Sequence, residues 1–97
     1  MEHNTNTIIE LTVFNHSGVM SHVTGLFSRR AFNLEGILCA PIGDAQMSKM
    51  YLFVSCNGCL EQIVKQLNKL YDVTEVIVRS DYDQNLFNKM HDFIARA

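Results

Sequence analysis

The sequence contains no tryptophan and only one proline, and its acidic residues outnumber its basic ones, ten to eight. A surface that binds nucleic acid needs clustered Lys and Arg to neutralise phosphates, whereas the only adjacent basic pair is Arg29 and Arg30. No apolar run approaches the ~20 residues needed to span a bilayer. We therefore expect neither nucleic acid nor a membrane as a partner.

The N-terminal segment also lacks the features of a targeting signal. Residues 1–10 are polar, with neither a basic start nor an apolar stretch, so we predict no signal peptide and a cytoplasmic protein. The length of 97 residues indicates one domain, and 47% of the residues are hydrophobic. Because a chain this short buries only about 60–65% of its unfolded surface, we expect it to complete its core by association.

Residue types that serve catalytic or metal sites are few and scattered. Cys56 and Cys59 have the spacing of a redox pair or half a zinc site, but the pattern lacks the remaining zinc ligands. We interpret them as small apolar residues at a strand-to-helix turn. His16 and His22 do not have the i, i+4 spacing that puts two ligands on one helical face, so each histidine is predicted to be an isolated surface residue. With no nucleophile motif either, we predict no catalytic and no metal-binding residues.

Hydrophobic periodicity divides the chain into strands and helices. Ile9, Leu11 and Val13 alternate with residues of the opposite face, which is typical of a strand with one buried side. The period then lengthens to that of an amphipathic helix, for which Ser17 is a suitable N-cap. The predicted strands are 7–15, 33–43, 47–56 and 72–79, and the predicted helices are 19–31 and 60–70.

Two of these strands carry information about their neighbours. Pro41 lacks an N–H group, so the 33–43 strand is expected at a sheet edge or beside a bulge. The 47–56 strand is apolar on both faces, as a central strand would be. A last apolar stripe predicts a C-terminal helix, and its members are Leu86, Phe87, Met90, Phe93 and Ile94.

The order of elements, βαββαβ, predicts an α+β domain with a ferredoxin-like fold. Right-handed crossovers on either side of a hairpin produce a four-stranded antiparallel sheet of order 4-1-3-2, with both helices on one face. We place this domain at residues 1–80 and a C-terminal helical tail at residues 81–97.

The sheet face without helices needs a cover. We expect Phe14, Ile37, Tyr51 and Phe53 on it, which makes it too apolar for solvent. The tail helix is expected to pack within the chain. A second copy of the chain, or a partner enzyme on which the tail docks, is the alternative.

One loop has the chemistry of a small-ligand site. It joins a predicted central strand to a helix and consists of Asn15, His16, Ser17, Gly18, Val19 and Met20. The first N–H groups of a helix have no acceptor within it and carry positive potential, which suits a carboxylate. Gly18 permits close backbone approach, and the Asn15 amide supplies a donor and an acceptor. The loop fits an amino acid zwitterion, and a simple capped turn explains the pattern equally well.

A set of motifs within residues 10–41 is more specific. Asn-x-Ser-Gly-Val begins at Asn15, and Gly-Leu-Phe-Ser-Arg-Arg-x-Phe-Asn-Leu-Glu-Gly begins at Gly25. With further matches over residues 60–73, these pieces closely resemble the ACT domain of the small regulatory subunits of acetohydroxyacid synthase, also called acetolactate synthase. The resemblance covers about residues 8–79. The chain is similar to the short, isozyme I form, and we expect it to lack the second domain of longer members.

The resemblance implies a homodimer, formed edge to edge through the second strand and through helix packing, that binds the large catalytic subunit. It implies that the assembly raises the activity of that subunit and confers feedback inhibition by valine, bound between the 15–20 loop and the second protomer. Asn33 of the partner subunit would then reach the effector, and Leu34 and Ile37 would contact its isopropyl group. Thiamine diphosphate, Mg²⁺ and FAD would belong to the large subunit, with no cofactor in this chain.

The resemblance leaves one residue and the effector open. His16 stands where longer members often carry an acidic residue, and we expect it to point to solvent rather than touch the ligand. The alternative to a valine-responsive subunit is an ACT-type sensor of another amino acid that regulates a different enzyme. A stand-alone ligand buffer is a more distant alternative.

Overall fold

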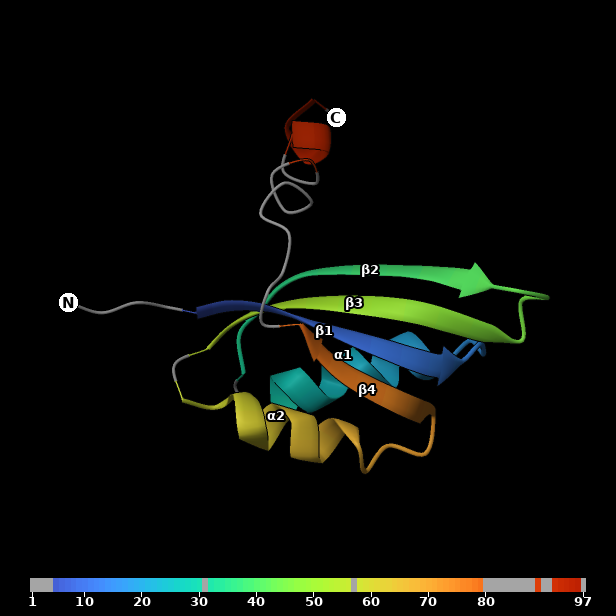
Figure 1. The fold of residues 1–97 in the computed structure, drawn as a ribbon, viewed down its shortest axis with the longest axis horizontal. Coiled ribbons are helices and arrows are strands. Elements are labelled where there is room, and N and C mark those ends of the chain that lie inside the picture. Colours follow the sequence, from blue (N-terminus) through green and yellow to red (C-terminus); the bar gives the residue numbers. More distant parts are fainter. Residues whose placement is uncertain (1–4, 31, 57, 80–88, 90–91, 97) are drawn as a thin grey trace.

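The computed structural model describes residues 5–30, 32–56, 58–79, 89 and 92–96. Its elements follow the predicted order βαββαβ (Figure 1). The strands are β1 (Thr5–Phe14), β2 (Leu34–Ile42), β3 (Met47–Cys56) and β4 (Val73–Arg79), and the helices are α1 (Val19–Arg29) and α2 (Leu60–Leu67). Residues 92–96 are also helical.

The four strands form one antiparallel sheet in the order β2-β3-β1-β4, as predicted. β1 pairs with β3 along its whole length, from Thr5 opposite Cys56 to Phe14 opposite Met47. β4 pairs with the other side of β1, with one register shift near Val13. Both α1 and α2 lie on the same side of the sheet (Figure 1). Successive strand residues therefore alternate between this helix side and the opposite side, called here the open face.

The hydrophobic core lies between the sheet and the two helices. Ile9, Leu11 and Val13 of β1 are fully buried, as their alternation predicts. The other buried members of the cluster are Val19, Val23, Leu26, Phe27, Met50, Leu52, Val54, Ile63 and Leu67. Because one cluster joins both helices to the central strands, the N-terminus of α1 is held in a fixed position relative to the end of β1.

β2 is an edge strand, as the proline predicts. It pairs with β3 on one side and has no described strand on the other. An edge strand tolerates Pro41 because one side of its backbone makes no ladder hydrogen bonds. β3 lies between β2 and β1, which explains why its residues are apolar on both faces.

The residues of the open face differ from the expectation at one position. Ile37 lies on the helix side, opposite Leu52, and packs against the core. A register shift between Leu34 and Gly36 inserts one residue into β2, and a one-residue shift exchanges the two faces of a strand. Leu38 consequently takes the open-face position.

The predicted tail packing is not found where the structure can test it. The side chains of Phe93 and Ile94 are 78% and 64% exposed, so neither packs within the chain. The other predicted members of that stripe, Leu86, Phe87 and Met90, lie outside the described residues, and the domain boundary at residue 80 stays a prediction. None of the helices in the described part of the chain is long and apolar enough to cross a membrane.

Candidate functional site

The loop between β1 and α1 is organised by a histidine. α1 begins at Val19 with Gly18 as its N-cap, and no side-chain hydrogen bond caps it, so the prediction that Ser17 is the N-cap is wrong. The N–H of Gly18 donates instead to Nδ1 of His16 at 3.1 Å. The N–H of Val19 donates to the carbonyl oxygen of His16 at 3.2 Å. His16 therefore replaces a capping serine in shaping this turn.

The start of α1 offers hydrogen-bond donors to a ligand. The first N–H groups of a helix lack an acceptor within the helix, and among the described residues no side chain caps α1. The first turn itself contains no acidic residue to offset the positive potential of the helix N-terminus, and the nearby carboxylate of Asp72 is paired with His22 of α1 and with His16. The N–H groups of α1 that follow Val19 therefore offer donors of the kind that bind a carboxylate.

Asn15 is anchored to the tip of the β2–β3 hairpin. Its Nδ2 donates to the carbonyl oxygen of Ala45 at 2.7 Å, and its backbone N–H donates to that of Gln46 at 3.0 Å. The side-chain nitrogen of Asn15 is thus already hydrogen-bonded within the chain. Its Oδ1 oxygen remains the atom that can accept a hydrogen bond from a ligand's ammonium group.

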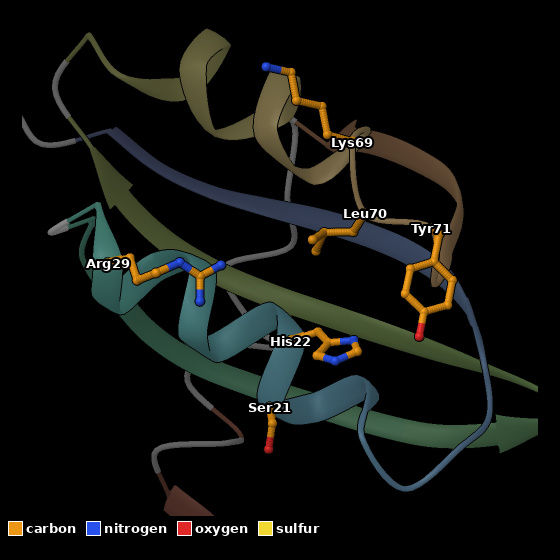
Figure 2. A pocket seen from close by; sticks show the side chains of 6 residues that line it. All are labelled: Ser21, His22, Arg29, Lys69, Leu70 and Tyr71. Carbon is orange, nitrogen blue, oxygen red and sulfur yellow. The ribbon is translucent and has the colours of Figure 1, made fainter.

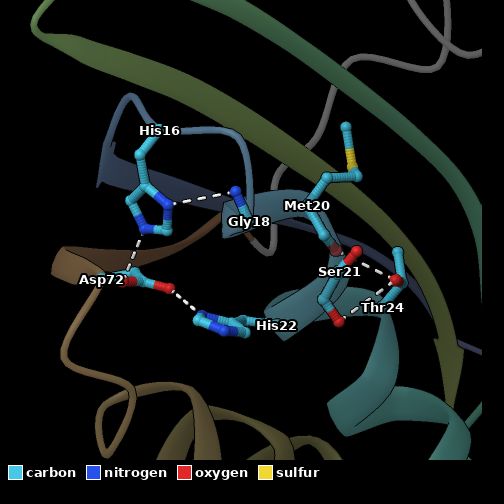
Figure 3. Close-up of polar contacts among 7 residues, drawn as sticks. All are labelled: His16, Gly18, Met20, Ser21, His22, Thr24 and Asp72. Atoms are coloured by element: carbon cyan, nitrogen blue, oxygen red, sulfur yellow. Dashed lines mark hydrogen bonds and ion pairs between the residues drawn. The ribbon is translucent and has the colours of Figure 1, made fainter.

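Asp72 connects the loop to α1 and β4. Its carboxylate is fully buried and contacts two imidazole rings (Figure 3): Nε2 of His16 lies 2.8 Å from Oδ1, and Nδ1 of His22 contacts Oδ2. The carbonyl oxygen of Asp72 accepts a hydrogen bond from the N–H of Phe14 at 2.9 Å. A single residue therefore joins the end of β1, the loop, the beginning of α1 and the start of β4.

These contacts fix the charge of Asp72 and the ring proton of His16. Because Nδ1 of His16 accepts from Gly18, a neutral His16 carries its proton on Nε2 and donates it to the carboxylate. Burial disfavours the charged form of Asp72, but the hydrogen bonds from His22 and His16 outweigh this effect and hold the pKa of Asp72 below its ordinary value. The carboxylate is consequently a fixed negative charge beside the loop.

The sequence-based interpretation of the two histidines is wrong. His16 and His22 were expected to be isolated surface residues, and His16 was expected to point to solvent. Their ring centroids lie 5.9 Å apart, and both side chains bind Asp72. Asp72 was missed as a site residue, although a lone carboxylate between apolar neighbours at a strand start is a signal for a buried, partnered charge.

The remaining loop residues contribute differently. Val19 is buried in the core, so only its backbone faces the loop. The side chains of Met20 and Ser17 are accessible, and that of Met20 is 38% exposed. Of the predicted loop residues, Asn15, Ser17 and the N–H groups at the start of α1 are therefore the polar groups that stay accessible.

The other predicted effector residues lie away from the loop of the same chain. Leu34 stands at the level of Thr7, near the start of β1, whereas the loop follows the end of β1. Leu34 and Ile37 pack against the core. Asn33 is exposed, and its Nδ2 donates to Oε2 of Glu35 at 2.6 Å. These three residues therefore do not meet the loop within one protomer.

A pocket of about 240 Å³ opens beside His22 (Figure 2). The ring of Tyr71 stands next to that of His22, with centroids 6.0 Å apart. The pocket gives solvent access to the exposed edge of the His22 ring. Its lining residues are Ser21, His22, Arg29, Lys69, Leu70 and Tyr71.

A second charged cluster lies on the open face. Glu10 is 5% exposed and accepts from Nζ of Lys49 and from Nε of Arg79, each at 2.8 Å. The hydrogen bond from Lys49, followed by that from Arg79, lowers the pKa of Glu10, and the bond to Glu10 raises the pKa of Lys49. Both carboxylate oxygens are used, so this cluster ties β1, β3 and β4 together and offers no free acid or base.

One cysteine differs from the expectation. Cys59 is disulfide-bonded, whereas its place at a strand-to-helix turn predicted a small apolar residue. Cys39 is exposed and free. A Cys-x-x-Cys spacing is compatible with thiols and with a disulfide, and composition does not decide between them.

A family model described as the AHAS small subunit-like ACT domain matches residues 9–75. The chain is 53% identical over 88 residues to the acetolactate synthase isozyme 1 small subunit of Escherichia coli K12, covering 91% of both chains. It is 44% identical over 77 residues to the acetolactate synthase small subunit of Haemophilus influenzae, covering 78% of this chain and 47% of that one. The chain thus spans nearly all of the first relative and less than half of the second.

Solved structures agree with the architecture. The acetolactate synthase small subunit of Thermotoga maritima superposes with a TM-score of 0.69 at 32% identity, over 75% of this chain and 46% of that one. The regulatory subunit of aspartate kinase from Thermus thermophilus gives a TM-score of 0.68 at 17% identity, over 81% of this chain and 53% of that one. This second likeness concerns the fold alone.

The buried carboxylate should contribute to stability in a pH-dependent way. Asp72→Asn keeps the shape of the side chain but removes its charge, and charge-assisted hydrogen bonds are about twice as strong as neutral ones. We expect the variant to unfold at a temperature lower by roughly 5 °C at pH 7, measured by circular dichroism with a chelator present.

The sign of the pH effect follows from the lowered pKa of Asp72. The stabilisation is complete above the ordinary carboxyl pKa and is lost as pH falls through the lower folded value, so the two melting temperatures should converge in acid. Asp44→Asn is the control, since Asp44 accepts only from the N–H of Gln46 in an exposed turn. Equal melting temperatures for wild type and Asp72→Asn at pH 7 would contradict this role.

Proposed function

Because this chain belongs to the acetolactate synthase small-subunit family of ACT domains, we propose that it is a non-catalytic regulatory subunit of that enzyme. It binds a large catalytic subunit, raises its activity and makes it sensitive to feedback inhibition by valine. The observation that carries this proposal is the 53% identity to an isozyme 1 small subunit over 91% of the chain. Thiamine diphosphate, Mg²⁺ and FAD would be bound by the large subunit and not by this chain.

The loop at residues 15–20 is the proposed site for the charged end of valine. The carboxylate would accept hydrogen bonds from the N–H groups of α1 that follow Val19, because the N–H of Val19 itself donates to His16 and no side-chain cap competes for the next ones. The ammonium group would donate to Oδ1 of Asn15, whose amide donor is held by Ala45. His16 supports this site from within the chain, since it shapes the loop through Gly18.

A second protomer would supply the rest of the site. β2 is an edge strand, and the Ile42 end of β2 lies at the same end of the sheet as Phe14, both opposite Met47. If two β2 edges pair antiparallel, the Leu34 end of the partner's strand comes beside this chain's Ile42 end. Asn33 of the partner subunit would thereby approach the loop. An unpaired edge also favours such pairing.

The apolar surface beside β2 supports the same dimer. A pocket of about 440 Å³ lies there, and Leu38 and Ile42 are 39% and 38% exposed. Burial of this surface in a second copy would remove it from water. The lining residues of this pocket are Leu38, Cys39, Ala40, Ile42, Lys49 and Tyr51.

A sensor of another amino acid is the second candidate for this chain. The ligand groups described above recognise only the carboxylate and ammonium that all amino acids share. The choice of valine rests on the family and on the apolar residues Leu34 and Ile37, which pack against the core in this structure. Titration with leucine, isoleucine and valine in parallel separates the two candidates.

Gly18→Asp should abolish valine binding while preserving the fold. Gly18 has φ −94° and ψ −5°, which any residue adopts, and an added Cβ would lie 3.4 Å from Cε1 of His16, an ordinary contact. Aspartate is also a favoured N-cap. Its charge, however, would repel the carboxylate of valine. We expect affinity to fall by at least about 100-fold in calorimetric titration.

Gly18→Ala is the matched control for that experiment. It adds the Cβ but neither a capping group nor a charge, so we expect it to lose less than about tenfold in affinity. Undiminished valine affinity in Gly18→Asp would exclude this loop as the effector site.

Asn33→Ala should separate inhibition from activation. Asn33 is exposed and bonds only to Glu35 within its described surroundings, so its loss should leave the fold unchanged. We expect weaker valine binding with nearly normal activation of the large subunit, measured by calorimetry and by acetolactate formation in the reconstituted enzyme. Equal loss of both properties would indicate that Asn33 is structural instead.

A further inference from the structure

Three side chains with metal-ligating atoms converge at the base of the loop. His16 comes from the loop, His22 from the first turns of α1 and Asp72 from the residue before β4 (Figure 3). One ligand atom of each lies within 4.8 Å of the others, and Nε2 of His16 is 2.8 Å from Oδ1 of Asp72. A tetrahedral ion with bonds of about 2.0–2.1 Å separates its ligand atoms by roughly 3.3 Å, so small side-chain shifts would accommodate it.

We infer that His16, His22 and Asp72 form a binding site for a divalent transition-metal ion, with Zn²⁺ as the best match. Two imidazole nitrogens and one carboxylate oxygen suit Zn²⁺, whereas Mg²⁺ and Ca²⁺ prefer oxygen ligands alone. The three ligands come from separate segments whose relative positions the core fixes. A preformed site of this kind binds its ion without refolding the chain.

The site also meets the requirements of charge and access. The carboxylate is buried, while the side chains of His16 and His22 are 38% and 43% exposed. An ion can therefore enter from the solvent side of the two rings, and a water molecule or another ligand can complete its coordination. Figure 2 shows Arg29 and Lys69 apart from the end of the pocket where His22 and Tyr71 stand. The carboxylate is thus the charge closest to the imidazoles.

Metal binding by neutral rings needs a tautomer change but no net loss of protons. Coordination through Nε2 of His16 moves its ring proton to Nδ1, and coordination through Nδ1 of His22 moves its ring proton to Nε2. The N–H of Gly18 then loses its acceptor on His16. The metal would thereby change the hydrogen bonding of the loop with only small shifts of the three side chains.

Hydrogen bonding and metal binding are distinguished by glutamine substitutions. His22→Gln retains an amide donor that can reach Asp72 but removes the imidazole lone pair. His16→Gln also retains a donor for Asp72, but it additionally removes the acceptor of the Gly18 N–H. A purely structural triad would tolerate the His22 exchange, whereas a metal site would tolerate neither. His91→Gln removes a histidine outside the triad and serves as the control.

The experiment is a zinc titration of the chelator-treated full chain against a chromophoric competitor, with Co²⁺ spectra as a second readout. We expect one Zn²⁺ per chain with micromolar or tighter affinity, and visible d–d bands of four-coordinate Co²⁺. Each glutamine variant, folded by circular dichroism, should lose at least about 100-fold in affinity and the Co²⁺ bands. His91→Gln should change neither.

Three results would overturn the assignment. They are a wild-type chain that does not bind Zn²⁺, unchanged affinity in both His16→Gln and His22→Gln, or an equal loss in His91→Gln. Valine plays no part in this titration, so its outcome is independent of the proposed regulatory function.

Discussion

The buried carboxylate of Asp72 is the constraint on which the geometry of the loop depends. A charge removed from water is stable only if it is partnered, and here the partners are His16 from the loop and His22 from α1. The backbone oxygen of the same residue holds the end of β1. The loop is therefore positioned by hydrogen bonds to Asp72, which precedes β4, as well as by the core.

This arrangement explains how a helix can begin without a side-chain cap. His16 accepts the N–H of Gly18 through Nδ1 and binds Asp72 through Nε2, so the turn keeps its shape with one imidazole. A serine or aspartate cap would satisfy the first N–H groups of α1 from within the chain. Without one, the N–H groups of α1 that follow Val19 stay available to a ligand.

Much of the fold could be predicted because it depends on local patterns. The alternation of Ile9, Leu11 and Val13 and the two-sided apolar character of 47–56 gave the correct strands and their order. Pro41 gave the correct edge. The bulge in β2 was not predictable, because no residue type marks the position where one extra residue enters the strand pairing. That extra residue moves Ile37 to the helix side. The histidine–aspartate triad was missed because Asp72 lies 56 positions from His16 and 50 positions from His22. Periodicity carries no information at that range.

The candidate site was predicted in part for the same reason. A helix N-terminus after a polar turn is a local feature, so the loop could be located from sequence. Its chemistry was predicted less well, since the donor of Asn15 is used by Ala45 and the role of His16 depends on Asp72. Leu34 and Ile37, assigned through the family resemblance, pack against the core instead of facing the loop of their own chain. Because of that separation, the proposed site requires two chains.

The central claim is that this chain regulates an acetolactate synthase, and reconstitution tests it most directly. The large catalytic subunit would be assayed for acetolactate formation alone, with the purified chain, and with the chain plus valine. We expect a higher rate of acetolactate formation when the chain is added, and a decrease of that rate with valine only when the chain is present. A rate that does not respond to the chain, with or without valine, would contradict this claim.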